Sequence, residues 1–198
     1  MNLPNKLTLS RLVLTLAFLI VIFSFPGTTW FATVGLVIFS IASLTDYFDG
    51  KIARERKLIT SFGILMDPLA DKVLICSAFI SFVELEWMPA WMVVVVVARE
   101  LTITGLRLLA ASKNVVMAAE RYGKHKTISQ IVAVIAILIF HAHTHWGAVG
   151  QIFSFKLLFE GPWVGWFSEL AKWVAVILTF YSGSVYLWKN REMFLSDM

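Results

Sequence analysis

The sequence predicts an all-α integral membrane protein with six transmembrane helices. Hydrophobic residues make up 59% of the 198 residues and charged residues 15%, whereas soluble domains average about 25% charged residues. A helix needs about 20 mostly apolar residues to cross a bilayer, and six apolar blocks are candidates. These blocks fill almost the whole chain, so we predict one membrane-embedded domain over residues 1–198.

The six candidate spans follow one another closely along the chain. They are residues 9–25, 30–47, 62–83, 88–109, 128–140 with flanks, and 166–188. The first span follows a basic start, as in a signal peptide, but no small-residue cleavage site comes after it. We therefore interpret it as a retained helix. The long aromatic stretch 147–165 is interpreted as a loop at the membrane interface.

The distribution of lysine and arginine predicts how the chain is oriented. These residues gather before the first span, after the last, and in the second-to-third and fourth-to-fifth connections, while the alternate connections hold only Lys156. Cytoplasmic loops carry the excess of such residues, so both termini are predicted to be cytoplasmic. We expect a multi-pass protein of the cell (inner, cytoplasmic) membrane. A basic rim facing anionic lipid accounts for the net charge of +4 without a nucleic-acid partner.

Four aspartates lie where the second span ends and the third begins: Asp46, Asp49, Asp67 and Asp71. A carboxylate within the hydrocarbon costs about 2.5–3.5 kcal/mol on insertion scales. If the second helix continues to Lys57, helical spacing places each pair on one helix face. Small residues share these faces and leave room beside the carboxylates. They are Gly50, Ala53, Gly63 and Ala70.

These carboxylates predict a site for divalent cations. Converging carboxylates repel one another, and oxygen ligands suit Mg²⁺, Mn²⁺ or Ca²⁺. The alternative is that the aspartates pair with neighbouring basic residues. Those residues are Lys51, Arg54, Arg56, Lys57 and Lys72. The number of aspartates and the small residues beside them favour the metal site.

The spacing of these residues resembles a family signature. It reads Asp46-x2-Asp49-Gly50-x2-Ala53-Arg54-x8-Gly63-x3-Asp67-x3-Asp71. Every fixed position matches the CDP-alcohol phosphotransferases, which are membrane enzymes of phospholipid synthesis. The resemblance covers essentially the full chain and implies the six-helix fold of that family. It also implies a cytoplasmic two-metal site, transfer from a CDP-linked donor to an alcohol with release of CMP, and a homodimer.

The resemblance implies roles for individual residues. Asp46, Asp49 and Asp67 would hold Mg²⁺ or Mn²⁺, two per site. Asp71 would join the same cluster and accept the proton of the acceptor hydroxyl. The residues expected to bind the CDP donor are Gly50, Ala53, Arg54, Asn5, Thr8 and Gly63. Two metals stabilise the attacking and leaving oxygens of an in-line displacement. We expect direct attack by the alcohol, and the pattern leaves a covalent intermediate open.

Basic residues outside the signature indicate the acceptor. They lie before the first span, in the segments 98–100 and 104–107 of the fourth, and in 123–127 before the fifth. Together these segments resemble family members that use CDP-diacylglycerol and sn-glycerol 3-phosphate. A dianionic acceptor needs cations, and arginine binds phosphate in bidentate fashion. The residues expected at the acceptor phosphate are Arg11, Arg99, Arg107, Lys124 and Lys126. For Arg11 and Asn5, contact with nucleotide or acceptor stays open; for Arg99 the alternative is an ion pair with Glu100.

Other interpretations remain open at this point. A related enzyme would use inositol phosphate, serine or phosphatidylglycerol as acceptor. An ion transporter also keeps carboxylates in the membrane, but it predicts acids spread across the membrane depth and often internal repeats. Here all four aspartates gather at one end and no repeat is seen. A structural scaffold leaves them unexplained.

Two remaining features are set aside. Cys76 is the one cysteine of the sequence, so no internal disulfide forms. His141, His143 and His145 form a histidine-rich tract at the outer end of the fifth span, with His141 and His145 on one helix face. We interpret them as solvated interfacial residues rather than a metal site.

Overall fold

The computed structural model describes residues 3–56, 61–112, 122–156 and 161–191. Within these ranges the chain is all-α, as predicted. The long helices are α1 (Leu3–Ser24), α2 (Phe31–Arg56), α3 (Ser61–Glu84), α4 (Ala90–Ser112), α5 (Tyr122–Ala142) and α7 (Trp163–Lys189). A short helix, α6 (Ala148–Ser154), lies between α5 and α7.

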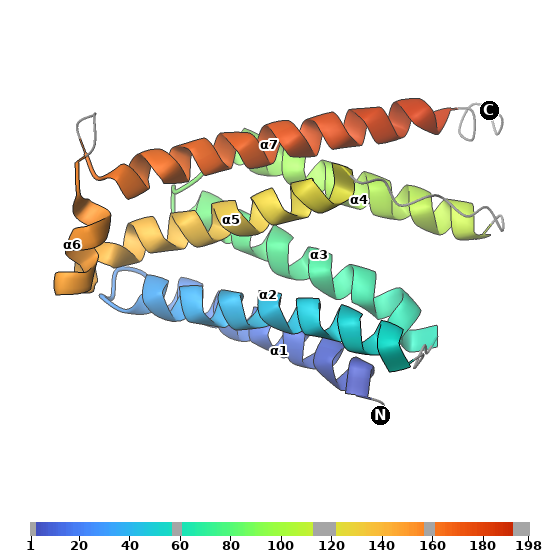
Figure 1. The fold of residues 1–198 in the computed structure, drawn as a ribbon, viewed down its shortest axis with the longest axis horizontal. Helices are drawn as coiled ribbons and strands as arrows, with labels where there is room; N and C mark the ends of the chain where they lie inside the picture. Colours follow the sequence, from blue (N-terminus) through green and yellow to red (C-terminus); the bar gives the residue numbers. More distant parts are fainter. Residues whose placement is uncertain (1–2, 57–60, 113–121, 157–160, 192–198) are drawn as a thin grey trace.

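Consecutive long helices run in opposite directions, and both chain termini lie at the same end of the molecule (Figure 1). We call the end that holds Leu3 and Lys189 the terminal end. The start of α1, the end of α2, the start of α3 and the end of α4 all lie there. Each of the six predicted spans overlaps one of these helices. That all six cross a membrane stays a prediction.

Helix packing buries an aromatic and aliphatic core. Helix α1 packs against α2 and α3, α5 packs against α2 and α7, and α4 packs against α3 and α7. Phe18 of α1 and Phe39 of α2 are fully buried, with ring centroids 6.1 Å apart. A Cβ at Gly35 would lie 3.0 Å from Ile22 Cδ1, so the glycine lets α1 and α2 approach closely.

The surface is apolar and the interior holds charges, which is the distribution of a membrane protein. Leu16 is 61% exposed and Trp188 is 71% exposed, whereas Glu100 and Lys126 are each 1% exposed. Two described segments are long and apolar enough to span a bilayer, His125–His145 and Trp163–Lys189. Shorter apolar segments occur in α1 and α2.

The prediction of a loop over residues 147–165 is wrong. Residues 148–154 form α6, and α7 begins at Trp163. Helix α6 packs against a 3₁₀ turn at His143–His145, and a Cβ at Gly150 would lie 2.0 Å from the His143 carbonyl oxygen. Phe153 and Trp163 of this stretch therefore belong to helices, whereas Phe155 follows the end of α6.

The interpretation of the histidine tract as solvated holds for the exposed His145 but needs correction for His141 and His143. Helix α5 ends at Ala142, so His141 and His145 do not continue one helix face. His143 is 3% exposed, and the His141 ring stacks on Trp87 with centroids 3.7 Å apart. Within the described residues, no group of three or more metal-ligating side chains is found here or elsewhere.

Candidate functional site

The four signature aspartates lie on two helices that contact each other at the terminal end. Asp46 and Asp49 belong to the last part of α2, and Asp67 and Asp71 to the first part of α3. Helix α2 continues through Arg56, so the helical spacing assumed for its aspartates holds. The structure describes the helices that carry these aspartates but not the aspartate side chains. The convergence of the four carboxylates therefore stays a prediction.

The residues predicted to bind the CDP donor lie on α2 and α3 and, in addition, on α1. Asn5 and Thr8 lie at the start of α1, Gly63 at the start of α3, and the remainder on the last part of α2. The remainder are Gly50, Ala53 and Arg54. The side chains of this set, and that of Lys124 at the start of α5, lie outside the described residues.

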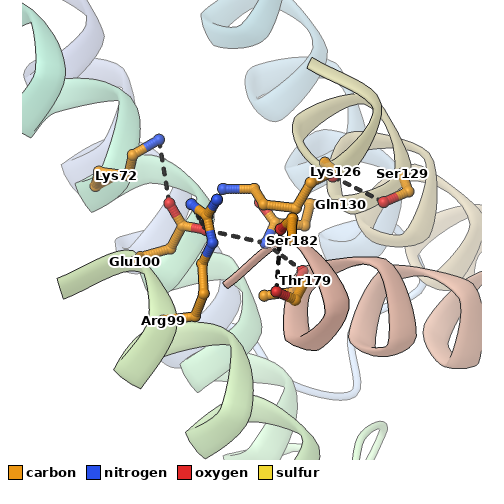
Figure 2. A network of polar contacts seen from close by, with 8 residues as sticks. All are labelled: Lys72, Arg99, Glu100, Lys126, Ser129, Gln130, Thr179 and Ser182. Carbon is orange, nitrogen blue, oxygen red and sulfur yellow. Dashed lines mark hydrogen bonds and ion pairs between the residues drawn. The ribbon is translucent and has the colours of Figure 1, made fainter. Parts of the chain in front are cut away.

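A buried cluster of charged side chains joins α3, α4 and α5 (Figure 2). Lys126 Nζ of α5 donates a hydrogen bond to Glu100 Oε1 of α4. Lys72 Nζ of α3 lies 3.2 Å from Glu100 Oε2, and Arg99 Nη1 lies 3.6 Å from Glu100 Oε1. We call these four residues the Glu100 cluster. The predicted alternative of an ion pair between Arg99 and Glu100 is present.

Hydrogen bonds extend this cluster to α7. Gln130 lies one turn after Lys126, and its Nε2 donates to Glu100 Oε1 at 3.3 Å and to Thr179 Oγ1 at 3.0 Å. Ser182 Oγ in turn donates to the Thr179 carbonyl oxygen at 3.1 Å. Gln130 and Thr179 are fully buried. One polar network therefore connects four helices inside the apolar bundle.

The Glu100 cluster carries more positive than negative charge. Within the cluster three cations lie around one carboxylate, and Lys72 has a further interaction beside these. Buried charges are costly unless they are paired and hydrogen-bonded. Arg99 Nε is buried and has no hydrogen-bond partner among the described residues. The cluster is therefore suited to an anionic ligand that brings further acceptors.

The two arginines predicted on the fourth span both approach α7. A Cβ at Gly183 would lie 2.8 Å from Arg99 Cγ, so the glycine makes room for the arginine. Arg99 also lines a groove of about 310 Å³ between α4 and α7. Arg107 Cζ lies 5.7 Å from the centroid of the Tyr186 ring.

Arg11, predicted at the same site, is 1% exposed on α1. Its backbone carbonyl oxygen accepts a hydrogen bond from Thr15 Oγ1 at 2.9 Å. The residue therefore lies inside the bundle rather than on its lipid-facing surface.

The sequence analysis did not assign Glu100, Lys72 or Gln130 to the site. One signal was available for Gln130, because residues four apart share a helix face and Gln130 follows Lys126 at that spacing. For Glu100 the signal was an acid inside an apolar span. The pairing of Glu100 with Lys72 and Lys126 depends on how three helices pack together. The residue pattern of a single helix does not reveal that packing.

Comparison with known proteins defines the class. Residues 1–181 match the family described as CDP-alcohol phosphatidyltransferase. The chain belongs to this family of transferases, which confirms the family predicted from the signature. Family membership and the apolar helices together indicate a membrane protein.

Relatives within the family carry more specific names. The chain is 40% identical over 204 residues to CDP-diacylglycerol–glycerol-3-phosphate 3-phosphatidyltransferase of Bacillus subtilis (strain 168), covering 96% of each chain. It is 32% identical over 197 residues to a Rickettsia felis protein of the same name, covering 98% of this chain and 97% of the other. A Mycobacterium tuberculosis protein named probable phosphatidylglycerophosphate synthase is 43% identical over 134 residues, which cover 67% of this chain and 64% of the other.

Proposed function

We propose that the protein transfers the phosphatidyl group of CDP-diacylglycerol to sn-glycerol 3-phosphate, giving phosphatidylglycerol phosphate and CMP. Relatives named for this reaction match the chain over nearly its full length. The structural observation that carries the proposal is the Glu100 cluster, where cations from three helices gather around one buried carboxylate and the Arg99 Nε donor has no hydrogen-bond partner among the described residues. Lys72 of that cluster directly follows Asp71, so the cations lie beside the signature aspartates along α3.

The aspartates fit a site for two divalent cations, Mg²⁺ or Mn²⁺. Asp46, Asp49, Asp67 and Asp71 form an oxygen-only donor set on two contacting helices, which hard cations prefer. Bound cations would neutralise charge on the donor pyrophosphate during transfer. In this proposal Asp71 also accepts the proton from the acceptor hydroxyl. Residues of α1 and the small residues of α2 and α3 border the cytidine diphosphate.

The acceptor phosphate would lie among basic side chains that the other helices supply. Arg99 and Lys126 belong to the buried cluster, with Arg107 further along α4. Arg11 and Lys124 complete the proposed set. An arginine offers a planar fork of donors to phosphate, and the buried Arg99 Nε has a donor to spare. These contacts would orient the acceptor hydroxyl toward the donor.

The proposal includes the membrane topology and assembly. All six long helices would cross the bilayer, with the terminal end cytoplasmic, because the basic connections lie at that end. The active site would then face the soluble acceptor while the helices contact membrane lipids and the lipid donor. A homodimer, implied by the family resemblance, is part of the same proposal.

The test is CMP release from CDP-diacylglycerol by the purified full-length protein in detergent micelles. We expect release that depends on sn-glycerol 3-phosphate, with Mg²⁺ or Mn²⁺ supporting it and a chelator stopping it. Turnover with inositol phosphate, serine or phosphatidylglycerol, and none with glycerol 3-phosphate, would assign a different acceptor. Absence of CMP release with every acceptor would contradict the transferase reaction itself.

A further inference from the structure

Glu100 is a carboxylate in the middle of a site proposed to bind an anion. It is 1% exposed, and burying a charge carries a free-energy cost. A carboxylate there also repels a phosphate electrostatically. The proposed reaction assigns it no contact with donor or acceptor. Its presence at this position therefore calls for a function other than direct binding.

The geometry of the cluster indicates that function. Oε1 of Glu100 accepts hydrogen bonds from Lys126 and Gln130 and lies near Arg99, while Oε2 lies 3.2 Å from Lys72. These cations come from three helices. Lysine side chains are flexible and lose considerable entropy when fixed. A shared carboxylate holds them in one place before any ligand arrives.

Glu100 leaves donors of the cluster available for a ligand. An ammonium has three N–H donors, and Lys126 uses one for Glu100 in the structure. Arg99 Nε has no hydrogen-bond partner among the described residues. The carboxylate thus fixes the cations without using all of their hydrogen-bonding capacity, and the net charge stays positive.

The same carboxylate links the acceptor side to the aspartate side. Lys72 follows Asp71 on α3, and its ion pair with Glu100 ties this part of α3 to α4. Small displacements of reacting groups cost large factors in rate, so a fixed spacing between the two sides matters.

We infer that Glu100 is a positioning residue for acceptor binding, which acts by holding the Lys126 ammonium and the Lys72 segment of α3 in register. The inference rests on the proposed function for the identity of the acceptor.

The first experiment compares Glu100→Gln with the wild-type enzyme in detergent micelles. Glutamine keeps the size of the side chain but removes the charge that holds three cations. We expect the KM for sn-glycerol 3-phosphate to rise roughly tenfold, as for other loss of supporting contacts, with the KM for CDP-diacylglycerol within about twofold. An unchanged KM for the acceptor, or equal changes in both KM values, would overturn the inference.

A double-mutant cycle tests whether Glu100 acts through Lys126. If it does, Glu100→Gln combined with Lys126→Met raises the acceptor KM by less than the product of the two single rises, because the part of the Glu100 effect that passes through Lys126 is already lost. Multiplying effects would show that Glu100 acts independently of Lys126 and would also overturn the inference.

Two controls separate positioning from folding. Glu169→Gln removes the same charge from the pair that Glu169 forms with Lys172, and it should leave both KM values within about twofold.

If Glu100→Gln does not yield folded protein, Glu100→Asp carries the test. We expect its acceptor KM to rise with the donor KM unchanged, and an unchanged acceptor KM contradicts the inference. A wild-type enzyme without glycerol-3-phosphate-dependent CMP release refutes the proposed function instead, whatever the variants do.

Discussion

Among the described residues, two buried lysines form ion pairs, and the surroundings of the two pairs differ. Lys126 pairs with Glu100, which is 1% exposed and faces two further cations. Lys172, near the start of α7, donates to the Trp87 carbonyl oxygen at 3.0 Å and pairs with Glu169, whose side chain is 59% exposed. At Lys172 one cation meets one carboxylate and a carbonyl. At Lys126 the cations outnumber the carboxylate.

This difference distinguishes the proposed binding region around Lys126 from the packed region around Lys172. The Lys172 region is built from aromatic contacts, including the stack of His141 on Trp87 and the pair of Phe82 with Trp87, 5.5 Å between centroids. Of the described buried polar atoms without a hydrogen-bond partner, Arg99 Nε, Glu100 Oε2 and Gln130 Oε1 lie in or beside the Glu100 cluster, and none belongs to the Lys172 region. The Lys172 region shows packing contacts, whereas the Arg99 Nε donor, without a hydrogen-bond partner among the described residues, supports the anion site proposed at the Glu100 cluster.

The largest effect on activity is expected at Asp71, next to Lys72 of the cluster. Asp71→Asn keeps the size of the side chain but removes the proposed base. We expect kcat to fall by at least about 10²-fold, since general bases contribute about 10²–10⁴-fold. Steady-state CMP release measures this, with circular dichroism and donor binding as controls for folding. Retained activity would exclude Asp71 as the base.

A second large effect is expected at Asp67, through the metal. Asp67→Asn removes one proposed oxygen ligand, so the Mg²⁺ concentration for half-maximal activity should rise more than about tenfold while kcat falls. Titration of activity with Mg²⁺ and with Mn²⁺ measures both quantities. A titration curve identical to the wild-type curve would contradict the ligand role.

The next largest effect on activity is expected at Lys126 of the Glu100 cluster. Lys126→Met removes the ammonium that pairs with Glu100, and a charged hydrogen bond contributes about 1.5–3 kcal/mol. We expect kcat/KM for glycerol 3-phosphate to fall about 10–100-fold. Lys172→Met, the matched change in the other region, should leave kcat/KM within about twofold. Equal losses in the two variants would remove the functional distinction between the regions.

The sequence predicted the helices better than their contacts. Apolar blocks are local, and each overlaps a long helix, with α5 beginning at Tyr122, before its short apolar run. Helix α6 was missed because a segment of 7 residues is too short to show a clear helical period. Local spacing also predicted that the two aspartates of α2 share one helix face and that the two aspartates of α3 share another.

Local sequence patterns did not predict the contacts within the Glu100 cluster. Lys72, Glu100 and Lys126 belong to three helices that are separated in the sequence, so their meeting depends on tertiary packing. The sequence analysis assigned Arg99 and Lys126 to phosphate binding because they are basic. It had no means of predicting that one carboxylate holds both of them.

The smallest effect tests the space around Arg99, which contributes the unpaired donor of the cluster. In Gly183→Ala the new Cβ would lie 2.8 Å from Arg99 Cγ, so the arginine must shift away from α7. We expect the KM for glycerol 3-phosphate to rise by up to about fivefold, which corresponds to about 1 kcal/mol of binding free energy. The KM for CDP-diacylglycerol should change little. Gly105→Ala on α4 is the matched control, because nothing lies within 4 Å of its Cβ position. That change should leave KM unaltered and stabilise the helix by up to about 1 kcal/mol. If the two alanine variants have the same acceptor KM, Arg99 tolerates displacement, and the excess charge of the cluster matters more than the position of this guanidinium.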